Sequence, residues 1–222
     1  ALKNLSVEIP LILTKEQETC VQVILTNEAN EEETGYHVEI YSRESTYDNL
    51  IKNTPWSCHA RGVLTLSLQV QQDTSNIEIK AIERRCQERS TEGLYDLIAE
   101  HGISYGPEFQ RIKRRWEGKQ ETLVELENVL ATSRGYCVHP TLLDCCFQAF
   151  SSQLVNDTIQ DKVYLPIGMK EVVWHRSLPV SSPLYAYTQW SGEMSEVFTG
   201  QVDLYDANDT LLLSVKGFAA KS

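Results

Sequence analysis

The sequence predicts an α+β fold of two antiparallel sheets, each built to wrap one central helix, with the first of the two incomplete. Apolar residues alternate with polar ones in both halves of the chain, which is typical of strands with one buried face. One long helical pattern, at 140–154, interrupts the strands of the second half. In the first half, by contrast, no helix-length apolar pattern lies between Ala1 and Gln72.

Residues 1–75 are predicted to form the first lobe. Apolar residues alternate along three segments, at Leu5, Val7, Ile9 and Leu11, at Tyr36, Val38 and Ile40, and at Leu64, Leu66, Leu68 and Val70. Polar connections, such as 27–34, separate these strands. An antiparallel sheet with one apolar face needs a partner layer. We therefore expect that either the second lobe covers this face or the covering element lies upstream of Ala1.

Residues 76–100 are predicted to be a connector with one or two helices. Ile79, Ile82, Leu94, Leu97 and Ile98 recur among charged residues with helical spacing. The stretch 90–93 (Ser-Thr-Glu-Gly) is expected to interrupt the helical pattern.

The second lobe is predicted to span 101–222 and to be rich in strands. The candidate strands lie at 111–116, 122–126, 172–176, 184–190, 197–205 and 211–218. The stretch 206–209 (Asp-Ala-Asn-Asp) has the composition of a hairpin turn.

The helix at 140–154 is apolar nearly all round. Leu143, Phe147, Phe150 and Leu154 recur at helical spacing, and Pro140 suits the first helical position. A helix of this kind is buried, and its natural place is inside a curled antiparallel sheet. That arrangement is the hot-dog fold, so the sequence predicts a double hot-dog whose first sheet lacks its helix.

Composition and charge exclude several classes of function. The 222 residues carry a net charge of -11, which argues against a surface that tracks nucleic-acid phosphates. No run of about 20 apolar residues could span a membrane, and no signal segment opens the sequence. The six cysteines are expected to be free thiols in a reducing cytoplasm. Because the adjacent Cys145 and Cys146 lack CxxC or HxxH spacing, no metal site is predicted.

Asp144 is the most informative candidate for chemistry. We expect it in the first turn of the apolar helix, where the helix dipole alone would favour an acid. Its neighbours are apolar, so burial would raise its pKa and suit it to hold a proton. Gln148 lies four residues on, on the same face of the helix, within reach of a hydrogen bond. The functional interpretation is a positioned general acid.

Two further positions have both a structural and a functional interpretation. His139 precedes Pro140 at the helix start, where an imidazole caps or packs as readily as it catalyses. Tyr105, Gly106 and Pro107 form a tight turn that begins the second lobe. The functional alternative is that the Tyr105 hydroxyl projects toward Asp144 and binds a substrate oxygen.

These residues together resemble the dehydratase domains of modular type I polyketide synthases. The resemblance rests on Leu94-Tyr95, Tyr105-Gly106-Pro107-Glu108-Phe109-Gln110, His139-Pro140-Thr141-Leu142-Leu143-Asp144 with Gln148, Leu165-Pro166-Ile167-Gly168, and Trp56, His59 and Gly62. These elements are similar to the family's YGPxFQ, HPxLLD, LPxG-like and WxxHxxG stretches. They occur in the family's order and span essentially the whole chain.

The resemblance implies the roles of the site residues. Asp144 would protonate the departing β-hydroxyl of a 3-hydroxyacyl chain, Gln148 would hold Asp144, and Tyr105 would bond the same oxygen. Substrate contacts are expected from Gly106, Pro107, Phe109, His139, Leu165 and Pro166. A histidine in an HxxxGxxxxP motif would remove the α-proton.

The resemblance also implies the partners. The acyl chain would be carried on the phosphopantetheine arm of an acyl carrier protein, with neighbouring synthase domains on the same polypeptide and two-fold pairing into a homodimer. No metal or diffusible cofactor would be needed for the elimination.

The sequence departs from the family at that histidine. Its histidines are His37, His59, His101, His139 and His175, and none has glycine four residues on. The family's motif would fall before Ala1. Three alternatives stay open: a dehydratase seen in part, an inactive pseudo-dehydratase with a structural or docking role, and a relative that shifts double bonds or closes rings.

Overall fold

The computed structural model describes residues 1–15, 18–29, 34–44, 55–66, 77–128, 135–136, 138–154, 164–179, 183–191 and 196–222. Its elements in chain order are β1 (Leu2–Val7), β2 (Thr19–Ala29), β3 (Thr34–Glu44), β4 (Ser57–Thr65), α1 (Ile79–Arg85), β5 (Gln87–Arg89), α2 (Leu94–Glu100), the 3-10 helix η1 (Pro107–Phe109), β6 (Ile112–Gly118), β7 (Glu121–Leu126), α3 (Pro140–Leu154), β8 (Leu165–Trp174), β9 (Leu184–Trp190), β10 (Val197–Tyr205) and β11 (Leu211–Lys221).

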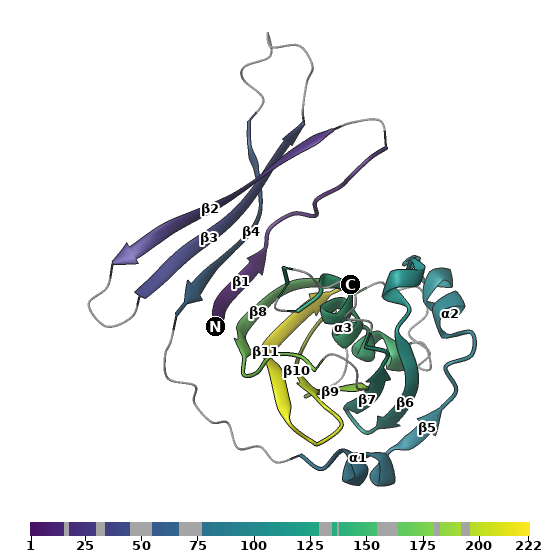
Figure 1. The fold of residues 1–222 in the computed structure, drawn as a ribbon. Coiled ribbons are helices and arrows are strands. Elements are labelled where there is room, and N and C mark those ends of the chain that lie inside the picture. Colours follow the sequence, from purple (N-terminus) through teal and green to yellow (C-terminus); the bar gives the residue numbers. More distant parts are fainter. Residues whose placement is uncertain are drawn as a thin grey trace.

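The strands described form one antiparallel sheet that curls at its second half. Their order across the sheet is β2-β3-β4-β1-β8-β11-β10-β9-β7-β6-β5. Figure 1 shows β7 to β11 curving around α3, while β2, β3 and β4 extend away from it. The two lobes meet where β1 pairs with β8, through Leu2 and Val172 among others.

Most second-lobe elements lie where the sequence predicts them. The bounds of α3, β9 and β10 match the prediction, and α1 and α2 flank the predicted break at 90–93. Two corrections apply: β8 begins at Leu165 instead of residue 172, and the short strand β5 was not predicted. The β5 sequence is Gln-Glu-Arg, all exposed, so it carries no apolar alternation to detect.

The first lobe differs more from its prediction. The stretch 27–34, predicted to be a polar connection, includes the paired ends of two strands, since Asn27 faces Tyr36 and Ala29 faces Thr34. An edge strand exposed to solvent on one side tolerates polar residues. The polar end of β2 therefore resembles a loop in the sequence, and the strand was not predicted. The strand predicted over Leu5–Leu11 ends at Val7. Beyond it, Ile9 accepts a hydrogen bond from His59 Nδ1 with its carbonyl, at 3.1 Å. Leu68 and Val70 lie outside the described residues.

The main core lies between α3 and the inner face of the curled sheet. Leu142, Cys145, Cys146, Ala149 and Phe150 of α3 are all buried. They pack against buried residues of five strands, Val124 and Leu126, Val172, Leu184 and Ala186, Val202 and Leu204, and Leu213 and Val215. The all-round apolar pattern of α3 therefore reflects its position inside the sheet.

The inner face of the sheet continues from the second lobe into the first. Leu2 pairs with the core residue Val172 on one side and with Leu64 on the other. Tyr36 continues this row in β3, facing Leu64. Side chains on one face of a sheet recur every second residue, so Val21, Val23 and Leu25 of β2 lie on this inner face as well.

Each lobe contains the same four-strand pattern. In the second lobe β8, β9, β10 and β11 are ordered β8-β11-β10-β9, and in the first lobe β1, β2, β3 and β4 are ordered β1-β4-β3-β2. The second lobe adds β7, which pairs with β9, and α3, which packs against β7 and β9. Among the described residues of the first lobe, nothing takes the place of that strand and helix.

The inner face of the first lobe is consequently exposed. Val21, Val23 and Leu25 keep 50%, 59% and 58% of their surface open to solvent. We expect the triple variant Val21→Thr, Val23→Thr and Leu25→Thr to lower the fluorescence of a bound hydrophobic dye by about half, because less apolar surface is left to bind it. Threonine is β-branched like valine, a shape that strands favour.

The matched control for this variant is Ile24→Thr, on the opposite face of the same strand. It should leave dye fluorescence close to that of the unmodified protein. Equal fluorescence of the triple variant and the unmodified protein would show that this face is covered in solution.

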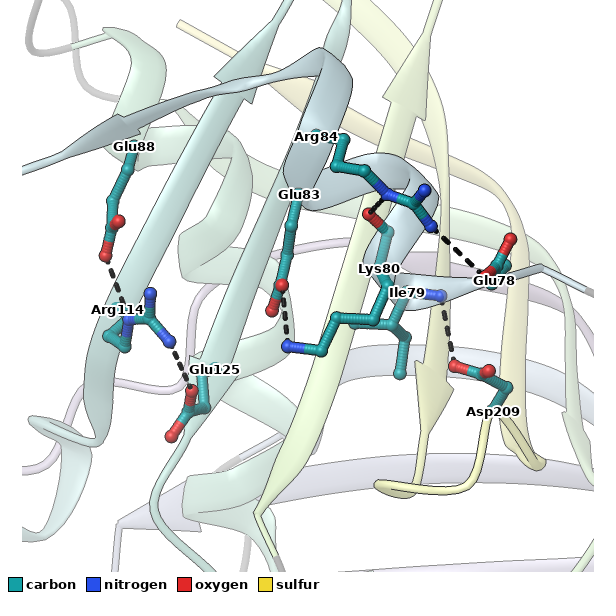
Figure 2. A network of polar contacts seen from close by, with 9 residues as sticks. All are labelled: Glu78, Ile79, Lys80, Glu83, Arg84, Glu88, Arg114, Glu125 and Asp209. Atoms are coloured by element: carbon teal, nitrogen blue, oxygen red, sulfur yellow. Dashed lines mark hydrogen bonds and ion pairs between the residues drawn. The ribbon is translucent and has the colours of Figure 1, made fainter.

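A second, smaller core anchors α1 to the outer face of the sheet. Ile79, Ile82 and Cys86 pack against Trp116, Leu123, Tyr187 and Tyr205. The Arg85 guanidinium binds the Glu121 carboxylate of β7, with Nη2 and Oε2 2.6 Å apart. The turn between β10 and β11 also holds α1, because Asp209 Oδ1 accepts a hydrogen bond from the Ile79 backbone N–H at 3.0 Å (Figure 2).

Charged pairs surround this second core on its exposed side. Figure 2 shows Arg84 with Glu78, Lys80 with Glu83, and Arg114 between Glu88 and Glu125. Exposed pairs of this kind contribute little to stability. Of the consecutive basic residues Lys113, Arg114 and Arg115, the first two form surface ion pairs, whereas Arg115 is buried and pairs with the buried Glu117.

Candidate active site

Asp144 is the fifth residue of α3, which begins at Pro140. The prediction that placed it in the first turn is therefore wrong by about one residue. The effect of the helix dipole falls off beyond that turn, so the dipole alone does not account for an acid here. Asp144 is half-buried. Burial raises the pKa of its carboxyl, and the hydrogen bond from Gln148 opposes that rise in part.

Gln148 holds the Asp144 carboxylate, as the four-residue spacing predicted. Its Nε2 donates to Asp144 Oδ2 at 2.8 Å and to the Phe109 carbonyl at 3.1 Å. Only 1% of the Gln148 surface is exposed. Because this amide is buried and hydrogen-bonded at both ends, the carboxylate faces a fixed donor.

The turn at 105–110 is bound directly to α3. Its Phe109 carbonyl accepts from Gln148 and from the Cys145 thiol, the latter at 3.1 Å. Gln110 Nε2 closes the turn by donating to the Tyr105 carbonyl at 2.7 Å. These bonds place Tyr105 beside the Asp144 face of the helix. The pKa of the Tyr105 hydroxyl is raised, first by burial and then by the nearby Asp144 charge.

Tyr105, Asp144 and Gln148 line one cavity of about 220 Å³, together with Leu165 and Pro166 of β8. The rest of the lining is mostly apolar, from Ile103, Phe147, Phe150, Tyr164, Phe198, Phe218 and Ala220. A site of this kind fits a nonpolar chain that carries a polar group at the Asp144 end. A larger, shallower depression of about 660 Å³ crosses the junction of β1 and β8, but its lining contains no carboxyl group.

Four other predicted contact residues do not line this cavity. Gly106, Pro107 and Phe109 shape the turn that carries Tyr105, with η1 at Pro107–Phe109. His139 lies at the start of α3, where its Nδ1 is 2.7 Å from Thr141 Oγ1. Its place favours the capping interpretation, and contact of these four residues with a substrate stays a prediction.

No histidine lines the cavity in the part of the chain that the structure describes. His59, from the WxxHxxG-like stretch, lies in β4, where its Nε2 is 2.7 Å from Ser42 Oγ. With its Nδ1 facing the Ile9 carbonyl, His59 joins β3, β4 and the segment after β1. This arrangement gives it a structural role in the first lobe.

Sequence reasoning missed Tyr95 as part of the site. Its hydroxyl donates to Gln148 Oε1 at 3.2 Å and accepts from the Ile112 backbone N–H at 3.2 Å. Its ring meets that of Tyr105 edge-on, with ring centroids 6.1 Å apart. Tyr95 lies in α2 and is 53 residues from Gln148 in the sequence, so no local spacing signals the contact.

The described residues also bear on metals, membranes and disulfides. They contain no group of three or more His, Cys, Asp or Glu side chains placed to hold a metal ion. Within the same ranges, no helix has the length and apolar character needed to cross a membrane. Cys20, Cys58, Cys86, Cys145 and Cys146 are free thiols.

Comparison with known proteins identifies the family of this chain. Residues 78–222 match the family model described as the polyketide synthase dehydratase N-terminal domain. The chain is 28% identical over 132 residues to the phthioceranic/hydroxyphthioceranic acid synthase of Mycobacterium tuberculosis, which covers 57% of this chain and 6% of that protein. It is 29% identical over 161 residues to polyketide synthase GfsA of Streptomyces halstedii, covering 70% of this chain and 2% of that protein. The chain thus spans only a small part of these multidomain relatives.

Solved structures show the same fold. The dehydratase domain from the CurK module of curacin polyketide synthase superposes with a TM-score of 0.82 at 22% identity, covering all of this chain and 75% of that one. The CurF dehydratase domain gives a TM-score of 0.80 at 26% identity, covering 99% and 74%. The predicted α+β double hot-dog fold is confirmed. With the family model matched over residues 78–222, the chain belongs to the polyketide synthase dehydratase family.

Proposed function

We propose that this domain removes water from a 3-hydroxyacyl chain to give the 2,3-enoyl thioester, with Asp144 as the general acid. The observation that carries the proposal is the half-buried Asp144 carboxyl, held by Gln148 and lining an apolar cavity together with Tyr105. A protonated carboxyl in such a cavity can donate its proton to a leaving hydroxyl.

In the proposed elimination, a base removes a proton from C2, and the electron pair of that C–H bond forms the C2=C3 double bond. The C3–O bond breaks, and the oxygen leaves as water with the proton of Asp144. The Tyr105 hydroxyl would bind the same oxygen. The base would be a histidine in an HxxxGxxxxP motif, which none of the five histidines of this sequence supplies. In support, an aspartate-to-asparagine and a histidine-to-phenylalanine variant of the CurK dehydratase are both described as inactive.

We infer the partners from the family. The acyl chain would arrive on the phosphopantetheine arm of an acyl carrier protein, and neighbouring synthase domains and a second copy of the domain would flank it. The apolar residues of the cavity, such as Phe147 and Phe218, would contact the acyl chain. The free cysteines agree with a reducing cytoplasm as the compartment.

To test this proposal, the intact mass of the purified protein is measured first. The protein is then incubated with a 3-hydroxyacyl thioester of pantetheine. We expect the 2,3-enoyl thioester to appear, and the reverse hydration to incorporate solvent deuterium at C2. Mass spectrometry and ultraviolet absorbance follow both directions. If neither product forms while an unrelated dehydratase converts the same substrate, the chain is a non-catalytic member of the family.

A further inference from the structure

We propose that Tyr95 is a positioning residue of this site, whose hydroxyl fixes the orientation of the Gln148 amide so that Nε2 faces Asp144. The inference rests on the proposed role of Asp144 and extends it to the connector helix α2. Tyr95 would act on Asp144 through Gln148 and would not contact the substrate.

The first step of the argument concerns the single hydroxyl proton of Tyr95. The hydroxyl oxygen accepts the Ile112 backbone N–H at 3.2 Å. Its proton can point to Gln148 Oε1, at 3.2 Å, or to the Phe109 carbonyl, at 3.5 Å. The shorter contact is to Gln148 Oε1, whereas the Phe109 carbonyl already accepts from Gln148 Nε2 and the Cys145 thiol.

The second step concerns the Gln148 amide, which has two ends and two possible orientations. In the structure Nε2 donates its two protons to Asp144 Oδ2 and the Phe109 carbonyl. Turning the amide over would place Oε1 against both of these acceptors. The Tyr95 hydroxyl opposes this turn because it supplies a donor for Oε1 only in the observed orientation. A buried amide cannot replace that donor with bulk water.

The third step concerns charge around Asp144. Among the described residues, Tyr95 of α2, Tyr105 of the turn, and Cys145 and Cys146 of α3 are titratable groups that interact electrostatically with it. Burial raises the pKa of Tyr95 and of Cys145 to about 12 each, and it raises those of Tyr105 and Cys146 as well. These four groups are therefore neutral near pH 7. The Gln148 amide is the group that lowers the pKa of Asp144.

The experiment titrates Asp144 by carboxyl-carbon NMR in four proteins: unmodified, Tyr95→Phe, Gln148→Leu and the double variant. Phenylalanine keeps the ring contact with Tyr105 and removes the hydroxyl. We expect Tyr95→Phe to raise the pKa of Asp144, because the Gln148 hydrogen bond that lowers it loosens. In the Gln148→Leu background, Tyr95→Phe should cause no further shift, since the two residues act in series.

Turnover gives the second readout. We expect Tyr95→Phe to lower kcat about three- to tenfold, the range of one net hydrogen bond. KM should stay within about twofold, because no substrate contact is lost. A general acid must be protonated, so the rate falls as pH rises through its pKa. A raised pKa would move that decline to higher pH. Tyr185→Phe, at the second core on the outer face, is the matched control and should change neither readout.

The proposal is overturned if Asp144 titrates identically in Tyr95→Phe and the unmodified protein, or if the effects of Tyr95→Phe and Gln148→Leu add. The NMR titration needs no turnover and therefore separates this inference from the proposed function. If Tyr95→Phe shifts the Asp144 pKa as expected while the unmodified protein forms no enoyl product, the positioning stands and the proposed chemistry fails.

Discussion

Replacing Asp144 by asparagine is expected to lower kcat/KM for dehydration by about 10²–10⁴-fold, the usual contribution of a positioned general acid. Asparagine keeps an oxygen that can accept the hydrogen bond from Gln148 Nε2, so the geometry of the site should persist. What it lacks is an acidic proton for the leaving hydroxyl. The measurement compares initial rates of enoyl thioester formation over a range of substrate concentrations.

The same variant should gain stability at neutral pH. Burial raises the folded-state pKa of Asp144, so the folded protein binds this proton more tightly than the unfolded chain. The stabilisation from that proton is present below the unfolded pKa and is lost as pH rises through the folded pKa. Asparagine carries no charge to desolvate. In urea unfolding, the free energy of unfolding of Asp144→Asn should therefore exceed that of the unmodified protein at pH 7, and this difference should become smaller at acid pH.

Glu100→Gln is the control for charge alone, because Glu100 is an exposed acid at the end of α2. It should keep the full rate of dehydration. An Asp144→Asn protein that dehydrates as fast as the unmodified one would show that the acid is elsewhere.

Truncating Phe150 to alanine is expected to cost about 3–5 kcal/mol of the free energy of unfolding, as for other buried aromatic residues. Phe150 is 1% exposed in the middle of α3. Its ring stacks on Phe218 with centroids 5.1 Å apart and meets Phe198 at 5.4 Å and Trp190 at 6.0 Å. Removing it leaves a cavity between α3 and the strands β9, β10 and β11, which the surrounding backbone cannot close.

Urea unfolding followed by tryptophan fluorescence measures this loss, with Leu97→Ala as the control. Leu97 lies on α2 with 40% of its surface exposed, so its truncation should cost much less. A loss below about 1 kcal/mol for Phe150→Ala would mean that α3 does not lie inside the sheet in solution.

The elements that could be predicted are those in which packing against a core determines the pattern of apolar residues in the sequence. The helix at 140–154 is apolar nearly all round because the sheet surrounds it. The strands β9 and β10 are rich in apolar residues because the main core covers one face and the second core, through Tyr187 and Tyr205, covers the other. The strand β2 was missed because it is an edge strand, where Asn27 and Glu28 are tolerated. Its residues Val23, Ile24 and Leu25 are apolar at three successive positions, which obscures a period of two.

For the site, the pair of Asp144 and Gln148 could be predicted because four residues make one helical turn. The Tyr105 turn could be connected to them only by resemblance. Tyr95 stayed without a role because its contact with Gln148 depends on how α2 packs against α3. Likewise, the structural place of His59 depends on Ser42 and Ile9, which are distant from it in sequence.

The repeated strand order of the two lobes has a consequence for the origin of the domain. The lobes meet through the antiparallel pair β1 and β8, each the first strand of its four-strand set. Two identical subunits related by a two-fold axis would meet through the same strand of each copy, in the same antiparallel manner. The topology is therefore that of a dimer joined into one polypeptide. Joining frees the two halves to diverge, so that an acid can be kept in one half while the other acquires a different task.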